Sequence, residues 1–485
     1  MRKDSAGWSG LFRYLIFTVL LAAVMWLFLA YSPMGVSERL DKYTQDLFNS
    51  RAGSWVYPND RQQDLTVLLL TDEVVDGVLH GQWPAPYSFH ASVLDDLLVH
   101  QPRAVFIDYY WMNLLKPGAD YLVSVLESYR EEGVPVYLAA PDENWLAARW
   151  PELVGLVIPV SAAVAMDPTD FVARSYPQES QGLRSAAFAI AEDQFAIRAD
   201  HRGALDIFWG TAENPLNHAW MQGGQATHSS ILGSLTQGFD GVNTPIPYTT
   251  TVFVRDLLNP VAESEDEALR ELDEHLKGRV VIYGASLSGI QDMVFTPTRA
   301  ILPGAYYHAM AIDNLLTWGA RFKASVPSRV APQWAEQVLV IFHFATLLAI
   351  AALVCRLKFH TPLACAATEQ LDAAASFARQ SPTFWRETRI KAAVLALVVT
   401  ACAVQFFVLD LSVAVWAGFL EMLGIGVVLD RLNVIERLLA WLESVRSCIA
   451  KYKNGSKGER NAEVNPRGDG STGHADDAVR ECRAD

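Results

Sequence analysis

Apolar residues gather into four long runs, one near the N-terminus and three in the last third of the chain. The first is residues 11–30, where Arg13 is the only charged side chain, and the others are 338–354, 392–409 and 411–429. Each approaches the roughly 20 residues that a helix needs to cross about 30 Å of hydrocarbon. The pattern predicts four transmembrane helices, and the first is too long for the apolar core of a cleaved signal peptide.

Lys and Arg residues lie before the first run, between the second and third, and after the fourth. Because cytoplasmic loops of membrane proteins carry an excess of these residues, we expect both termini in the cytoplasm. Residues between the first two runs are then exported as one domain. The expected boundaries are 1–10 cytoplasmic, 11–30 transmembrane, 31–335 exported, 336–355 transmembrane, 356–391 cytoplasmic, 392–409 and 411–429 transmembrane, 430–452 an amphipathic helix, and 453–485 a disordered tail.

Inside the exported part, short apolar runs alternate with stretches of helical spacing. Three such runs have the character of buried strands, and a helical pattern follows each of the first two; the strands are 65–71, 104–108 and 134–139, and the helices 88–100 and 119–132. A fourth strand is expected at 279–283, before a helix at 306–318. The alternation predicts an α/β fold, a doubly wound and mainly parallel sheet, with 140–278 as an inserted irregular subdomain.

Composition fits this picture and excludes some partners. Hydrophobic residues make up 51% of the 485 residues, and the net charge of −15 resides mainly in the exported part. An acidic surface argues against nucleic acid as a partner, which requires a basic footprint. The five cysteines all lie outside 31–335 and lack zinc-binding spacing, so we expect no disulfide, metal or cofactor.

Two long blocks of sequence resemble a known family. Residues 65–98, LTVLLLTDEVVDGVLHGQWPAPYSFHASVLDDLL, are followed by RAVFIDYYW, and later by GRVVIYGASLSGIQDMVFTPTRAILPGAYYHAMAIDNLL. They closely resemble the CHASE2 family, and the similarity extends over about residues 35–430. It implies an extracytoplasmic sensory domain in a multi-pass receptor of the bacterial inner membrane.

The chain departs from the family pattern at two places. Members commonly have a WPWPR-like loop, whereas this chain has WPAPY, so Ala85 and Tyr87 replace an aromatic residue and an arginine. Members usually continue into a kinase or cyclase domain, and here too few residues follow the fourth run for either. We therefore expect a separate cytoplasmic kinase, cyclase or regulator to read the signal.

Polar side chains at the ends of the expected strands form the candidate site. In an open α/β sheet, ligands bind at the carboxyl ends of the strands, and we expect Asp72 and Asp108 to end adjacent strands there. Candidate ligand-binding residues are Asp72, Trp83, Asp108, Ser286, Asp292 and His308. Structural alternatives remain open: an Asp that caps a turn, a buried histidine, and a tryptophan that covers the sheet edge.

No catalytic motif is recognisable. GASLSG at 284–289 lacks the Lys-Ser/Thr pair of a phosphate-binding loop, and Gly284 is expected to permit a tight exit from the strand. We expect no enzyme, with a metal-assisted hydrolase built on Asp72, Asp108 and His308 as the least favoured alternative.

Two features near the C-terminus also carry expectations. Glu421 falls in the middle of the fourth run, where an ionised carboxylate is costly, and we expect it to meet Thr400 or Thr346. Apolar residues then follow at heptad spacing, at Ile435, Leu438, Leu442, Val445 and Ile449. They predict either a coiled coil that pairs two copies or a helix lying on the membrane.

The sequence as a whole favours a sensor that contacts the lipid bilayer, forms a homodimer and signals to a separate protein. A structural subunit of an envelope assembly with no small-molecule ligand is the alternative.

Overall fold

The structure, a computed structural model, describes most of residues 36–324 and only a few positions outside them. The described ranges are 36–111, 117–199, 203–212, 214–217, 247–259, 265–288, 292–298 and 300–324, with isolated positions 19, 392, 396, 399, 400 and 403. The chain divides into two compact units, and the folded domain described below lies in the unit that includes Met34–Ile341.

The expected four-span bundle requires correction. Among the residues in these ranges, no helix is both long and apolar enough to cross a membrane. Helix α2 (Val36–Val56) has 21 residues, but charged side chains are spread along it. The described residues therefore show an α/β fold, and they do not show the expected four-span bundle.

Most residues of the four apolar runs lie outside the described residues. So do Glu421 and Thr346, and the heptad positions Ile435, Leu438, Leu442, Val445 and Ile449. Thr400 is described only as an exposed helical residue.

A six-stranded sheet with every strand parallel forms the centre of the domain, and its order is β4-β3-β2-β10-β1-β9. The strands are β1 (Leu65–Thr71), β2 (Ala104–Ile107), β3 (Val136–Ala139), β4 (Ile158–Val160), β9 (Thr250–Phe253) and β10 (Val280–Ser286). β1 and β10 are buried almost throughout, as expected for strands that helices cover on both faces. The predicted α/β fold with a parallel sheet is confirmed.

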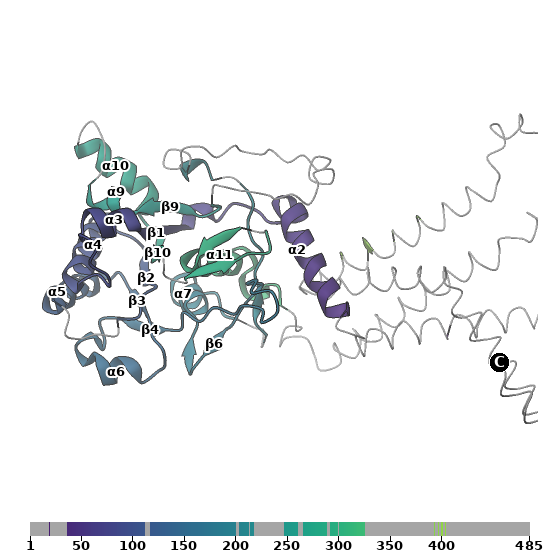
Figure 1. Cartoon of the computed structure of the whole chain (residues 1–485), viewed down its shortest axis with the longest axis horizontal. Coiled ribbons are helices and arrows are strands. Elements are labelled where there is room, and N and C mark those ends of the chain that lie inside the picture. Colours follow the sequence, from purple (N-terminus) through teal and green to yellow (C-terminus); the bar gives the residue numbers. More distant parts are fainter. Residues whose placement is uncertain are drawn as a thin grey trace, which may run out of the picture. The chain divides into compact units, whose positions relative to one another are not determined.

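Helices cover both faces of this sheet (Figure 1). One face carries α4 (Tyr87–Val99), α5 (Ala119–Glu131) and the short α9 (Val254–Leu258); α4 packs against each of the other two, and all three contribute to one apolar cluster. The other face carries α7 (Ala186–Phe195) and α11 (Gly304–Trp318). α2 lies on the α11 side of the sheet (Figure 1).

Smaller elements complete the domain. They are α3 (Asp72–Gly77), α6 (Trp145–Arg149) and α10 (Glu265–Leu276), and three two-stranded pairs: β5 (Ser175–Tyr176) with β8 (Leu205–Asp206), β6 (Glu179–Ser180) with β7 (Leu183–Arg184), and β11 (Met293–Phe295) with β12 (Ile301–Pro303).

Residues 140–278 differ from the expected irregular insertion, because they supply both edge strands of the sheet, β4 and β9. β9 has the sequence TTVF, and distant residues satisfy its hydroxyl and amide groups: Arg279 and Asn214 donate to Thr250 Oγ1, and Thr251 N donates to Asn217. Because these partners are distant in sequence, the residues of β9 alone do not predict a strand.

β10 continues three residues beyond the predicted end, through Gly284 to Ser286. A Cβ on Gly284 would lie 2.7 Å from the Cβ of Ala305, which is too close for real atoms. The glycine therefore does not provide a turn; it allows the first turn of α11 to pack against the strand.

Candidate functional site

The carboxyl edge of the sheet brings together the ends of β1, β2 and β10, as the sequence predicts. Thr71 pairs with Ser286 and Ile107 with Tyr283, so Asp72, Asp108 and Ser286 all follow or end strands at this edge. However, β10 lies between β1 and β2. The expectation that Asp72 and Asp108 end adjacent strands is wrong, because the last strand of this sheet in sequence inserts between its first two.

Asp72 has a structural partner at this edge. Its carboxylate accepts hydrogen bonds from the backbone N–H of Ser288, at 3.1 and 2.9 Å, and hydrogen bonds from Ser288 lower the pKa of Asp72. The residue thus fixes the loop after β10 to the end of β1, as the turn-capping alternative describes.

Trp83 is partly buried and packs against both the main apolar cluster and a small one formed by Val75, Ala285 and Leu287. Tyr109 packs against the same small cluster. Together they form an aromatic cover over the end of β10. This placement agrees with the reading of Trp83 as a residue that covers the sheet edge.

Asp108 and Asp292 form a pair of largely buried acids beside the start of α11. Burial, and then the charge of Asp292, raise the pKa of Asp108 well above its usual range. Burial also raises the pKa of Asp292 to about 6. Burial therefore favours the neutral form of both acids, and Asp292 changes its charge near pH 6.

Asp292 contacts the first residue of α11 in two ways. Its backbone oxygen accepts a hydrogen bond of 2.9 Å from Gly304 N, and a Cβ on Gly304 would lie 2.5 Å from Asp292 Oδ1. A negative charge at this position faces the positive end of the helix dipole, but the cost of burying that charge outweighs this attraction, because the pKa is raised. Ionisation of Asp292 thus acts directly on the first turn of α11.

His308 lies one turn further along α11 and is almost completely buried, with 1% of its side chain exposed. Its Nε2 is 3.7 Å from Asp108 Oδ1, beyond hydrogen-bond distance, and burial lowers the pKa of His308 to about 3. Burial thus favours the neutral form of both side chains, which argues against an ion pair between them.

A hydrogen-bond chain fixes the orientation of His308. The N–H of Ala187 donates to Tyr176 Oη at 3.2 Å, and Tyr176 Oη lies 2.7 Å from His308 Nδ1. The hydroxyl accepts from Ala187 and can donate its own proton to Nδ1, an arrangement in which Nε2 carries the histidine proton. That proton is directed to the side on which Asp108 lies.

Asp108, Asp292 and His308 can exchange protons, since two acids of raised pKa lie beside a neutral imidazole. A positive charge nearby would favour the ionised form of either acid. Among the described residues, no group of three or more His, Cys, Asp or Glu side chains could hold a metal ion. The set Asp72, Asp108 and His308, which a metal-assisted hydrolase would use, is thus not assembled as a metal centre in this part of the chain.

At its other end, α11 contacts the segment that follows α2. Tyr57 Oη donates a short hydrogen bond to Asp313 Oδ1, and burial raises the pKa of Asp313 to about 7. Asn314 clamps the backbone of Phe208 with two bonds of 2.9 Å, and Trp209 N donates to Asn49 of α2 at 3.2 Å. α11 therefore connects the acid pair to α2.

Ion pairs attach α2 to the domain as well. Arg174 donates to both oxygens of Asp46, at 2.8 and 2.7 Å, and to both oxygens of Asp170, at 3.0 and 2.7 Å. Lys42 pairs with Asp167 at 2.7 Å. The guanidinium is largely buried, which makes it the stronger of the two attachments.

Sequence reasoning missed Tyr176, Gly304 and Asp313. Asp313 had a readable signal, since Asp-Asn within AMAIDNLL places two polar residues in an apolar helical stretch. Tyr176 had none, because its partner His308 is 132 positions away along the chain.

One comparison with known proteins identifies the family of this chain. The CHASE2 domain matches residues 18–352, which is more than half of the chain and includes every strand of the sheet. No curated protein and no solved structure shows significant similarity to the chain. CHASE2 domains are a family of extracellular sensor domains. The chain belongs to the CHASE2 domain family.

Proposed function

We propose that this protein is a receptor of the bacterial inner membrane whose exported CHASE2 domain senses acidification at the Asp108–Asp292 pair. The protein acts as a homodimer and passes the response to a separate cytoplasmic partner, which is a kinase, a cyclase or a regulator. The domain needs no catalysis of its own for this role.

The observation that carries the proposal is the contact between Asp292 and Gly304. A carboxyl with a pKa of about 6 changes its charge within the range of pH that an exported domain meets. Because the carboxyl lies against the first residue of α11, gain or loss of a proton changes the free energy of that contact directly.

Transmission requires an element whose two ends contact different parts of the domain. α11 contacts the acid pair at Gly304 and His308, and the segments beside α2 at Asp313 and Asn314. A ligand or proton shifts a conformational equilibrium only through a difference in affinity between the two states. The raised pKa of Asp292 provides such a difference, provided that the contact with Gly304 loosens in one state.

The experiment is in-cell crosslinking followed by affinity purification of the full-length chain from its native host. It compares external pH 5.5 with 7.5, in the wild type, in Asp292→Asn and in Asp76→Asn, which removes an exposed carboxylate on α3. We expect pH to change the captured cytoplasmic signalling proteins in the wild type and Asp76→Asn, and not in Asp292→Asn.

Capture of the same proteins at both pH values in all three chains would contradict acid sensing. If those proteins were components of an envelope assembly rather than signalling proteins, the structural-subunit alternative would replace the receptor.

A further inference from the structure

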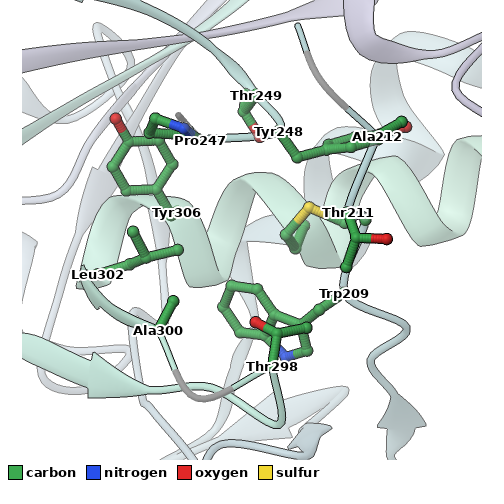
Figure 2. Close-up of a pocket in the computed structure, with 12 residues that line it drawn as sticks. Trp209, Thr211, Ala212, Pro247, Tyr248, Thr249, Thr298, Ala300, Leu302 and Tyr306 are labelled. Atoms are coloured by element: carbon green, nitrogen blue, oxygen red, sulfur yellow. The ribbon is translucent and has the colours of Figure 1, made fainter. Parts of the chain in front are cut away.

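A cavity lies between α11, the β11–β12 pair and the segment that follows β8. The space between its walls amounts to about 440 Å³ when the adjoining open solvent is included, and the cavity shares no residue with the acid pair. Figure 2 shows its labelled side chains around a central space, with Tyr306 and Leu302 on one side and Thr211 and Ala212 on the other. The described residues that line it are Trp209, Gly210, Thr211, Ala212, Pro247, Tyr248, Thr249, Thr298, Ala300, Leu302, Tyr306 and Met310.

No residue of this described lining carries a charge, and most of the wall is aromatic or aliphatic. Close packing shapes one wall, because a Cβ on Gly210 would lie 2.3 Å from the ring of Tyr248. An ion would lose its hydration in such a cavity without gaining a counter-charge. The lining therefore selects an uncharged ligand.

Nearly all polar groups of the buried lining side chains have partners within the domain. Tyr306 Oη lies 2.7 Å from Thr251 Oγ1, and Trp209 Nε1 donates to Ala173 O at 3.2 Å. Thr298 Oγ1 lies 2.8 Å from Thr296 Oγ1, and Tyr248 Oη donates to Pro58 O at 3.2 Å.

Thr249 is the exception among them. It is 2% exposed, and its Oγ1 has no hydrogen-bond partner in the described part of the chain. Buried hydroxyls without a partner are rare in folded proteins, since each costs about 1–3 kcal/mol. Such a hydroxyl in the wall of a cavity can form a hydrogen bond with a bound ligand.

We propose that this cavity binds a small uncharged molecule that combines an apolar ring with a hydroxyl group. The ring would pack against Tyr306, Leu302 and Trp209, and the hydroxyl would pair with Thr249. The site also adjoins the path to α2, because Trp209 in its wall donates its backbone N–H to Asn49. The inference concerns binding alone and does not depend on the acid-sensing proposal.

The test uses fluorine NMR on the purified full-length chain with three probes of nearly equal size at pH 7. They are 4-fluorobenzyl alcohol, which is neutral, 4-fluorobenzylamine, which is cationic, and 4-fluorobenzoate, which is anionic. We expect line broadening that saturates for the alcohol and none for the two ions.

Two variants test whether the alcohol binds in this cavity. Thr249→Val keeps the side-chain shape and removes the hydroxyl, so affinity for the alcohol should fall by about 3- to 10-fold. Ala300→Phe fills the space and should abolish binding. Thr71→Val, a matched change at the carboxyl end of β1, should bind like the wild type.

The proposal fails if no probe binds, which would mean that the cavity holds water only. It also fails if the two ions bind with the same affinity as the alcohol. It fails too if Thr249→Val and Ala300→Phe keep the melting temperature of the wild type and bind the alcohol with wild-type affinity. Asp292→Asn should bind the alcohol normally, which separates this result from the acid-sensing proposal.

Discussion

Asp292 and Gly304 touch so closely that no side chain fits between them: a Cβ on Gly304 would lie 2.5 Å from Asp292 Oδ1. The same two residues share a backbone hydrogen bond of 2.9 Å. The position of α11 is thus tied to the position, and through it to the charge, of one buried carboxyl.

Gly304→Ala should therefore destabilise the domain although alanine favours helices. The added methyl group displaces the carboxyl of Asp292, and overpacking of this kind costs about 1–3 kcal/mol. Denaturant unfolding measures the effect, with Gly77→Ala as the control, because nothing lies within 4 Å of a Cβ at that position. Equal free energies of unfolding for the two variants would show that the Asp292 contact is not tight.

Asp292→Asn should remove a pH-dependent part of the stability. The pKa of Asp292 is raised in the folded domain to about 6 from an ordinary value of 3.8. The folded state then holds its proton at pH values where the unfolded chain has lost it. The contribution of this group is fully present below pH 4 and is lost as pH rises to 6, by on the order of 3 kcal/mol at most.

His308 acts in the opposite direction, because its pKa is lowered to about 3 from 6.5. Its contribution to stability is present above pH 6.5 and is lost as pH falls toward 3. The measurement is therefore the difference in unfolding free energy between the wild type and Asp292→Asn at a series of pH values. A difference that stays constant from pH 4 to 7 would contradict a raised pKa for Asp292.

Tyr57→Phe should destabilise the domain by about 1–3 kcal/mol, since it removes the hydrogen bond to Asp313 and leaves that buried carboxyl short of a partner. Combining it with Asp313→Asn tests the pair in a double-mutant cycle by thermal unfolding. The two effects should be non-additive because the residues are in direct contact. Additive effects would mean that Tyr57 and Asp313 contribute independently.

Arg174→Lys should weaken the attachment of α2, because lysine cannot donate to both oxygens of Asp46 and Asp170 at once. Arg184→Lys is the control, since that arginine pairs with Glu192 and Asp193 while 43% of its side chain is exposed. We expect limited proteolysis to cut the α2 segment faster in Arg174→Lys alone. Equal cleavage in both variants would assign the attachment to other contacts.

The sequence pattern was informative where burial is continuous. β1, β2, β3 and β10 are apolar runs, and α11 shows helical spacing, so both the parallel sheet and its last helix were predictable. β9 was not, because the partners of Thr250 and Thr251 come from Asn214, Asn217 and Arg279. The insertion of β10 between β1 and β2 is a property of chain topology that no local pattern records.

The candidate site was predictable to a similar extent. The rule that strand ends share an edge brought Asp108, Asp292 and His308 to one place, where they lie beside the start of α11. It could not distinguish Asp72, whose carboxylate is occupied by Ser288. Nor could it indicate Gly304, because the reason for that glycine is a contact 12 residues away that exists only in the fold.

The central claim is that α11 transmits the charge of Asp292 to α2, and hydrogen exchange of the full-length chain tests it most directly. At pH 7.5, where Asp292 is ionised, we expect peptides from 304–318 and 36–56 to exchange faster in the wild type than in Asp292→Asn. At pH 5.0 the two chains should coincide, while peptides from α5 serve as the reference in both. Equal exchange of 36–56 in the two chains at pH 7.5 would contradict the account.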